Sequence, residues 1–187
     1  MSRFDVNNIP NKYFRESSYL NKFRGKNTFI QNKICSFHDY DNLYLISKFY
    51  DGYILNHLKY NWNEEQIKFF SACLIQSLIN LRKKHLIHRD IHFSNIVLDE
   101  KQYISLIDFH IVIDYKKKDN PKRNRFIGSP DLSAPEILKK LKYDYNSDYY
   151  RLGSMLYYFY FYDTYRNIFY FQALYFFKCS NITYNLN

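Results

Sequence analysis

The sequence predicts an α+β fold, because two helix patterns and two strand patterns recur along one chain. Apolar residues at spacings of three and four over 64–84 indicate a helix, and a second helix is expected from Asp148 to about Tyr160. Strand-forming residues gather in 42–50 and in two short runs within 96–107. With 187 residues, 47% hydrophobic and 24% charged, the chain is expected to fold as a globular domain.

Residues 64–84 carry the clearest helix pattern. Asn63 is expected to cap the helix, with Gln66 as the reciprocal member of a capping box. Basic residues in the last turn complement the negative end of the helix dipole. The expected buried stripe is Ile67, Phe70, Leu74, Leu78 and Leu81, with Ile75 and Ile79 widening it.

Weaker patterns fill the rest of the chain. Residues 11–24 are compatible with a helix whose apolar side is Tyr13, Phe14, Tyr19, Leu20 and Phe23. Asp51-Gly52 predicts a turn after the first strand pattern, and 96–98 with 103–107 predict a short hairpin. Residues 114–126 are expected to form a loop, and the nearly all-apolar helix from Asp148 suggests a buried core helix.

The formal charge of +9 fits an anionic ligand but does not choose among nucleotide, acidic peptide and nucleic acid. The three cysteines show no CxxC spacing, which suits reduced thiols in the cytoplasm or nucleus. The N-terminus has no apolar signal segment, and no charge-free run reaches the roughly 18 residues of a membrane span. We therefore expect a cytoplasmic or nuclear protein without a membrane partner.

Two polar segments flank the predicted hairpin: His88–Asn95 precedes it and Asp108–His110 follows it. Phosphoryl transfer from a nucleotide needs a divalent cation, side chains that hold it, and a base that orients the acceptor hydroxyl. A loop with one Asp and one Asn, joined by a hairpin to a second Asp, can bring those groups together.

The motifs resemble those of the eukaryotic protein kinases, of the serine/threonine type. His88-Arg-Asp-Ile-His-Phe-Ser-Asn95 resembles the catalytic loop HRDxxxxN, and Asp108-Phe109 resembles the start of DFG. Gly128–Glu136 resembles the substrate segment that ends in APE, and Asp148–Gly153 resembles DxWSLG. Glu16-Ser-Ser-Tyr-Leu20 resembles the αC segment of AGC-type kinases.

The resemblance implies a protein-kinase-like fold, mainly the helical C-lobe with a partial N-lobe. Residues 1–50 would form the partial N-lobe, with an αC-like helix and strands leading to the hinge. Residues 51–162 would form a partial C-lobe with the catalytic and activation segments, and 163–187 match no pattern. The glycine-rich loop and the VAIK lysine are not found ahead of Glu16, which predicts a domain incomplete at both ends.

The resemblance also implies roles for residues, with ATP and Mg²⁺ as cofactors. Asp90 would orient the substrate hydroxyl, and Asn95 and Asp108 would hold Mg²⁺. The implied catalytic residues are Asp90, His92 and Asn95. The implied ATP-binding residues are Glu16, Lys48, Tyr50, Val97 and Asp108. The implied activation and substrate residues are Arg89, Ser129 and Glu136, and the structural residues are His88, Phe109 and Asp148.

Two residues depart from the family pattern within these motifs. His92 stands where serine/threonine kinases have a lysine, so a fixed positive charge is expected to be lost. His110 stands at the glycine of DFG, where a positive φ or a close approach would favour glycine.

Three functions stay open from the sequence. The first is a serine/threonine protein kinase acting on protein hydroxyls; basic residues around 116–125 could favour acidic substrates. The second is a catalytically impaired pseudokinase or interaction module. The third, a basic nucleic-acid-binding protein, is disfavoured because the aromatic residues follow helical stripes rather than one strand face.

Overall fold

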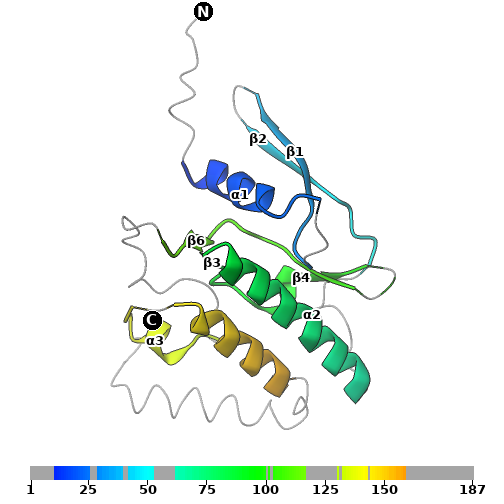
Figure 1. The fold of residues 1–187 in the computed structure, drawn as a ribbon, viewed down its shortest axis with the longest axis vertical. Coiled ribbons are helices and arrows are strands. Elements are labelled where there is room, and N and C mark those ends of the chain that lie inside the picture. The colour runs from blue at the N-terminus through cyan, green and yellow to red at the C-terminus, as the bar shows by residue number, and fades with distance from the viewer. Residues whose placement is uncertain are drawn as a thin grey trace, which may run out of the picture.

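The computed structural model describes residues 11–25, 29–39, 42–52, 62–99, 101, 103–116, 130, 132–142 and 144–158. Along the chain the elements are α1 (Asn11–Asn21), β1 (Lys33–His38), β2 (Leu43–Ser47), α2 (Glu64–Lys83), β3 (Leu86–Ile87), the 3₁₀ turn η3 (Phe93–Asn95), β4 (Ile96–Leu98), β5 (Ile104–Leu106), β6 (Ile113–Asp114) and α3 (Pro135–Leu138) (Figure 1). Residues 146–158 are also helical. The expected α+β class is confirmed. None of the described helices is long and apolar enough to cross a membrane.

Three small antiparallel sheets carry the described strands. β1 pairs with β2, β3 with β6, and β4 with β5. The β4–β5 hairpin is the one predicted at 96–107. β6 is a correction: Asp114, assigned to a loop from sequence, pairs with Leu86. A strand of two residues carries no alternation, so no residue pattern could indicate it.

Helix α2 runs through the centre of the described structure, as Figure 1 shows. The predicted capping box is present: Asn63 accepts from the Gln66 backbone, and the Gln66 side chain accepts from the Asn63 backbone. The five core positions of the expected stripe are buried, but Cys73 and Ser77 widen it rather than Ile75, which is exposed, and Ile79, which is only partly buried. The helix begins one residue after its predicted cap and ends within one residue of its predicted end.

Helix α1 buries the second half of the apolar side predicted for it. Tyr19 and Leu20 are buried, as is Phe23 just after the helix. The side chains of Tyr13 and Phe14 lie outside the part of the chain that the structure describes. The predicted helix at 11–24 is therefore confirmed, with its last turn ending at Asn21.

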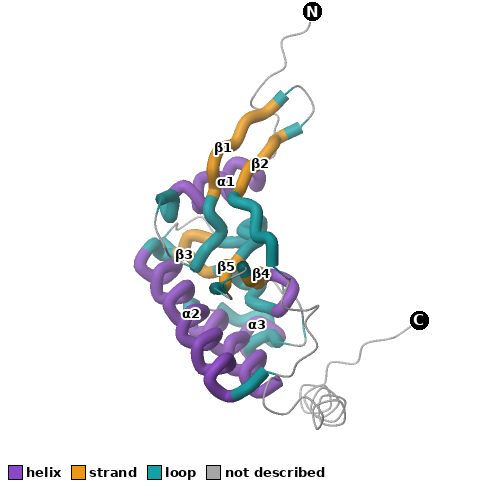
Figure 2. Tube along the Cα trace, turned by 90° about the vertical axis from the view of Figure 1, so that its right-hand side faces the viewer, coloured by secondary structure: helices purple, strands orange, loops and turns teal. Residues whose placement is uncertain are grey.

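Residues 146–158 lie beside α2 in Figures 1 and 2 and pack into the same core. The helix begins two residues before Asp148. Leu152 and Met155 are buried, whereas Tyr150 and Tyr157 are 46% and 37% exposed. The expected buried core helix is therefore buried on one face only, because tyrosine can keep its hydroxyl end in water.

One apolar core lies between α1, α2 and the β4–β5 hairpin. It contains Leu20 and Phe23 from the α1 region, the buried stripe of α2, Ile96 and Leu106 from the β4–β5 hairpin, and Phe109. α1 covers one side of the β1–β2 hairpin and lies behind its two strands in Figure 2. This core holds the β4–β5 hairpin, which joins the polar segment His88–Asn95 to the polar segment Asp108–His110.

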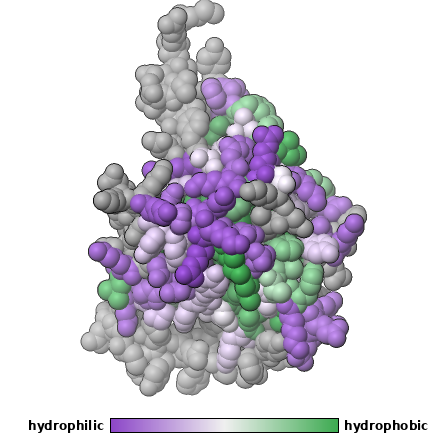
Figure 3. Space-filling view, in the orientation of Figure 1, coloured by the Kyte–Doolittle hydropathy of each residue, from purple (hydrophilic) through white to green (hydrophobic). Residues whose placement is uncertain are grey.

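The β1–β2 hairpin presents apolar side chains to solvent, visible as green surface near the top of Figure 3. Phe37 stacks on Tyr44 across the strands at 4.9 Å between ring centroids. β1 was not predicted, because its polarity is inverted: Lys33 is buried while Ile34 and Phe37 are half exposed. Such a strand does not show the usual apolar-inside alternation.

Gly52, in the predicted turn, lies against the end of β4. A Cβ added to it would come within 1.9 Å of the Leu98 carbonyl oxygen. The close approach of the two backbones therefore requires glycine at this position.

Candidate active site

The predicted catalytic loop lies between β3 and η3 and is almost wholly buried. His88 and Arg89 are 0% and 3% exposed, and Asp90 is 9% exposed. Arg89 has a φ of 72°, in the left-handed region that disfavours side chains. Such backbone strain persists only where surrounding contacts hold it, and it concentrates at functional sites.

Asp148 supplies contacts that hold this loop. Its carboxylate accepts from the His88 backbone N–H at 2.7 Å and from the Arg89 backbone N–H at 2.9 Å. Both donors are buried, and without an acceptor each would cost about 1–3 kcal/mol. The helical residues 146–158 thus fix the backbone that presents Asp90.

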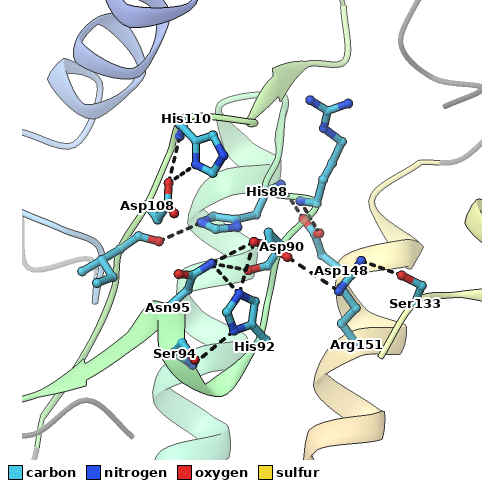
Figure 4. A network of polar contacts seen from close by, with 12 residues as sticks. His88, Asp90, His92, Ser94, Asn95, Asp108, His110, Ser133, Asp148 and Arg151 are labelled. Carbon is cyan, nitrogen blue, oxygen red and sulfur yellow. Dashed lines mark hydrogen bonds and ion pairs between the residues drawn. The ribbon is translucent and has the colours of Figure 1, made fainter. Parts of the chain in front are cut away.

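Asp90 and Asn95 face each other at the centre of the network in Figure 4. The Asn95 amide nitrogen donates to the Asp90 carbonyl oxygen at 3.0 Å and to Asp90 Oδ2 at 3.1 Å. Because the nitrogen is committed to Asp90, Asn95 Oδ1 is the atom of this side chain that suits a cation.

His92 lies beside Asp90 and contacts the backbone of the same loop. The Ser94 backbone N–H donates to His92 Nδ1 at 3.2 Å, so that nitrogen carries a lone pair. Its Nε2 lies 3.2 Å from Asp90 Oδ2 and 3.0 Å from the Asn95 amide nitrogen. His92 therefore contacts the carboxylate without bringing the fixed charge of a lysine.

Asp108 is tied to the catalytic loop through its neighbours. His88 Nε2 donates to the Ile107 carbonyl oxygen at 3.2 Å, and the Ile107 N–H donates to the Asn95 carbonyl oxygen at 2.9 Å. The His88 ring also meets the edge of Phe109 at 5.1 Å. These contacts place Asp108 on the same side of the hairpin as Asp90 and Asn95 (Figure 4).

The residue with a left-handed backbone in this segment is Asp108, with a φ of 65°. His110 is not among the described residues of positive φ, so the expected need for glycine there does not arise from backbone conformation. Instead, His110 Nδ1 and its backbone N–H both approach Asp108 Oδ1. One oxygen of the predicted metal ligand thus has a hydrogen-bond partner.

Burial shifts the pKa values of His88 and Asp148, and the two shifts make stability depend on pH in opposite directions. Burial lowers the pKa of His88 from 6.5 to about 4, against the nearby Asp90 and Asp108 carboxylates. Burial raises the pKa of Asp148 from 3.8 to about 6, against the His88 and Arg89 N–H groups. The His88 contribution to stability is present above pH 6.5 and is lost as the pH falls through 4. The pH-dependent part of the Asp148 contribution is present below pH 3.8 and is lost as the pH rises through 6, so the two nearly offset; its hydrogen bonds from the His88 and Arg89 N–H groups remain at pH 7.

Replacement of His88 by phenylalanine is expected to expose the Asp148 dependence alone. The unfolding free energy at pH 7 minus that at pH 5 should be about 2 kcal/mol lower in the variant than in the wild type, because the variant has no imidazole at this position. Urea unfolding at the two pH values measures it. His38→Gln is the control, because His38 is exposed and should leave the difference unchanged. An unchanged difference in His88→Phe would contradict the assignment of a buried, neutral imidazole.

Glu16, expected to pair with a phosphate-binding lysine, lies on α1 next to the Asp108 segment. Its Oε1 accepts from the Phe109 backbone N–H at 3.3 Å. Burial raises the pKa of Glu16, and the Phe109 N–H partly opposes that rise. The buried Lys33 ammonium reaches Ser17 Oγ at 2.6 Å and Asn21 Oδ1 at 3.0 Å instead, and burial lowers its pKa.

Of the other predicted ATP-binding residues, Val97 lies in β4, and Lys48 and Tyr50 follow the end of β2. Val97 is buried in β4 opposite Ser105. Lys48 donates its backbone N–H to the Asn32 carbonyl oxygen at 2.8 Å, and its ammonium lies 5.6 Å from the Tyr50 ring centroid.

Of the three residues predicted for the activation and substrate segments, the structure describes Arg89 and Glu136. Arg89 Nε donates to the Ile111 carbonyl oxygen at 2.7 Å, and Nη2 approaches the same oxygen. Glu136 lies half-buried in the short helix α3. Ser129 lies outside the described residues.

Arg151 is a site residue that the sequence interpretation missed. It is fully buried, its Nη2 donates to Ser133 Oγ at 2.7 Å, and its Nη1 lies 3.9 Å from Asp90 Oδ1. A signal was available: Asp148, Arg151 and Met155 recur at helical spacing on one face, so an arginine stands within a buried stripe.

The donor set suits magnesium. Among the described residues no cluster of three His, Cys, Asp or Glu side chains could form a cage for a metal. Mg²⁺ instead takes one or two protein oxygens together with water and substrate phosphates. Asn95 Oδ1 and the partly exposed Asp108 carboxylate fit that requirement.

Comparisons with known proteins identify relatives of this chain. A family model described as "Protein kinase domain" matches residues 2–170. Protein kinase C delta type of Rattus norvegicus is 32% identical over 135 residues, which cover 71% of this chain and 20% of that protein. Serine/threonine-protein kinase sgk-1 of Caenorhabditis elegans is 29% identical over 154 residues, or 81% of this chain and 33% of that protein. Serine/threonine-protein kinase YPK2/YKR2 of Saccharomyces cerevisiae is 35% identical over 125 residues, or 65% of this chain and 18% of that protein. The chain thus spans a third or less of the length of these relatives.

Proposed function

We propose that this chain, which belongs to the protein kinase family, supplies the catalytic and metal-binding part of a serine/threonine protein kinase. The expected AGC-like resemblance is confirmed by the relatives described above. The observation that carries the proposal is the Asp90–Asn95 pair, bonded at 3.0 and 3.1 Å and tied through Ile107 to Asp108. In the proposed site this pairing turns one amide oxygen and one carboxylate towards a shared cation.

In this proposal Asp90 accepts and orients the hydroxyl of the substrate. His92 and Asn95 hold its Oδ2 by hydrogen bonds, so the carboxylate keeps a fixed direction. Asn95 and Asp108 would hold Mg²⁺, which when bound neutralises charge on the phosphates of ATP. The protein thus contributes orientation and electrostatics rather than covalent chemistry.

In the proposed site the nucleotide lies between the partial N-lobe and the partial C-lobe. Val97 would lie under the adenine, and the backbone from Lys48 to Tyr50 would meet its edge. Glu16 would act from the N-lobe side, where it accepts from the Phe109 N–H. Residues 1–50 then form the partial N-lobe and 51–162 the partial C-lobe.

The substrate of the proposed kinase is a protein serine or threonine. Ser129 and Glu136 would form the segment that receives it, and Arg89 would stabilise the activation segment through its bond to the Ile111 carbonyl oxygen. The basic residues around 116–125 favour an acidic peptide as substrate.

A catalytically impaired module is the second candidate, and one observation favours it. His110 occupies Asp108 Oδ1, which competes with a cation for that oxygen. Impairment predicts that the site does not bind Mg²⁺ with ATP.

The two candidates are separated by the thermal stability of the chain with ATP and Mg²⁺ together. Binding to the folded state should raise the melting temperature by a few degrees at saturating ligand. ATP with a chelator should give a smaller rise. Asp108→Ala should abolish the metal-dependent part, because it removes a predicted ligand.

Glu65→Gln is the matched control, since Glu65 is an exposed carboxylate in the first turn of α2. It should retain the full response to ATP and Mg²⁺. If the wild-type chain gives no metal-dependent rise, the impaired module is the correct function and the kinase proposal is wrong.

A further inference from the structure

Arg151 brings a buried positive charge from the helical residues 146–158 to the proposed catalytic base. Its side chain is 0% exposed, and in Figure 4 its guanidinium lies between Asp90 and Ser133. Nη1 is 3.9 Å from Asp90 Oδ1, and Nη2 is 2.7 Å from Ser133 Oγ. A charge taken fully out of water is costly unless other groups compensate it.

The compensation comes from a balanced buried cluster. Two arginines and two aspartates, each at most 9% exposed, make up this cluster: Arg89, Asp90, Asp148 and Arg151. The charge of Arg151 also acts on Asp148, on the same helical face. With two charges of each sign, loss of one member leaves an excess charge in a buried region.

Within this cluster the two oxygens of Asp90 meet different kinds of donor. Oδ2 accepts from the Asn95 amide and lies 3.2 Å from His92 Nε2. Oδ1 faces the Arg151 guanidinium. The carboxylate is therefore held from two sides, and a fixed positive charge reaches it from the helix rather than from position 92.

Ser133 extends this contact to the substrate segment. It precedes Ala134, the N-cap residue of α3, and its backbone N–H donates to the Pro130 carbonyl oxygen at 3.0 Å. The hydrogen bond from Arg151 to Ser133 Oγ therefore links that segment to the same guanidinium that faces Asp90.

We propose that Arg151 is a positioning residue that couples the substrate segment, through Ser133, to the orientation of Asp90. The proposal rests on the kinase function proposed above. A planar guanidinium can hold two partners in different directions at once, which a lysine ammonium on the same stem does less well. The coupling therefore depends on the fork of the arginine as well as on its charge.

The first test needs no activity. In the full chain, melting temperatures are measured for wild type, Asp90→Asn, Arg151→Met and the double variant. Asp90→Asn alone is expected to lower the melting temperature by roughly 6–15 °C, because it leaves Arg151 without that carboxylate. In the Arg151→Met background the same change should cost less than roughly 3 °C. Additive effects would overturn the contact between the two residues.

The second test is a matching cycle between Arg151→Met and Ser133→Ala, which probes the other arm of the guanidinium. The loss of melting temperature in the double variant should differ by roughly 2–4 °C from the sum of the two single losses, because the two side chains share a buried charge-assisted hydrogen bond. Additive effects here would overturn the link to the substrate segment, even if the Asp90 cycle shows coupling.

Kinetics with a serine peptide then separate positioning from folding alone. Arg151→Met should lower kcat at least about tenfold while leaving the KM for ATP within about twofold, and Arg151→Lys should recover part of the loss. Tyr150→Phe, an exposed neighbour on the same helix, should match wild type. Equal losses in the lysine and methionine variants, with a changed KM for ATP, would overturn the positioning role. If wild type transfers no phosphate, the proposed function fails, and the two thermal cycles alone decide the coupling.

Discussion

Replacement of Asp90 by asparagine is expected to reduce phosphoryl transfer to a serine peptide by about 10²–10⁴-fold. The variant keeps the shape of the side chain but removes the negative charge that would accept the hydroxyl proton. It also places an amide beside Asn95 Nδ2, which in the wild type donates to Asp90 Oδ2 at 3.1 Å. Initial rates with ATP and Mg²⁺ measure the effect, at a temperature where both proteins are folded.

Asp99→Asn serves as the control for that measurement. Asp99 accepts from the Lys101 and Tyr103 backbone N–H groups in the hairpin turn, and asparagine can accept the same bonds. Its rate should match wild type. Unchanged transfer in the Asp90→Asn preparation would mean either that the activity comes from a contaminant or that Asp90 is not the base.

Asp148→Ala is expected to cost about 3–5 kcal/mol of unfolding free energy, the largest loss of stability that we expect from one substitution in the described structure. The change removes the acceptor of two buried backbone N–H groups, those of His88 and Arg89. It also removes one of the two buried carboxylates that balance Arg89 and Arg151. Urea unfolding at pH 7 measures the loss, and Asp148→Asn should lose less because its amide oxygen still accepts.

Asp144→Ala gives the scale for this comparison. Asp144 lies four residues earlier, is only partly buried, and caps the Asn146 N–H at 2.8 Å. Its loss should cost about 1 kcal/mol, as for other helix caps. Equal losses at the two positions would contradict the view that Asp148 holds a buried charge cluster.

The elements that could be predicted from sequence are those whose signal is local. α2 has an apolar stripe and both members of its capping box, so its predicted bounds were within one residue. The β4–β5 hairpin was equally local, with apolar runs around a polar turn at Asp99. The motifs around Asp90 and Asp108 could be recognised because their spacing along the chain is fixed by that hairpin.

The features that could not be predicted depend on contacts between distant segments. β1 buries Lys33 against Ser17 and Asn21 of α1, so its polarity makes sense only beside that helix. The helical stripe indicates that Arg151 is buried, but its partner Asp90 lies 61 positions earlier in the sequence and is found only in the fold. The contact of His110 with Asp108 is local, but it occurs beside a left-handed backbone at Asp108 that no residue pattern indicates.

Paramagnetic relaxation by Mn²⁺, added with ATP in place of Mg²⁺, tests the shared cation site most directly. The account predicts strong broadening of the Asn95 side-chain amide and of the Asp108 and Phe109 backbone signals, with α2 signals near Glu64 unaffected. Broadening that is absent at Asn95, or that appears around surface carboxylates without any need for ATP, would contradict a cation held between Asn95 and Asp108.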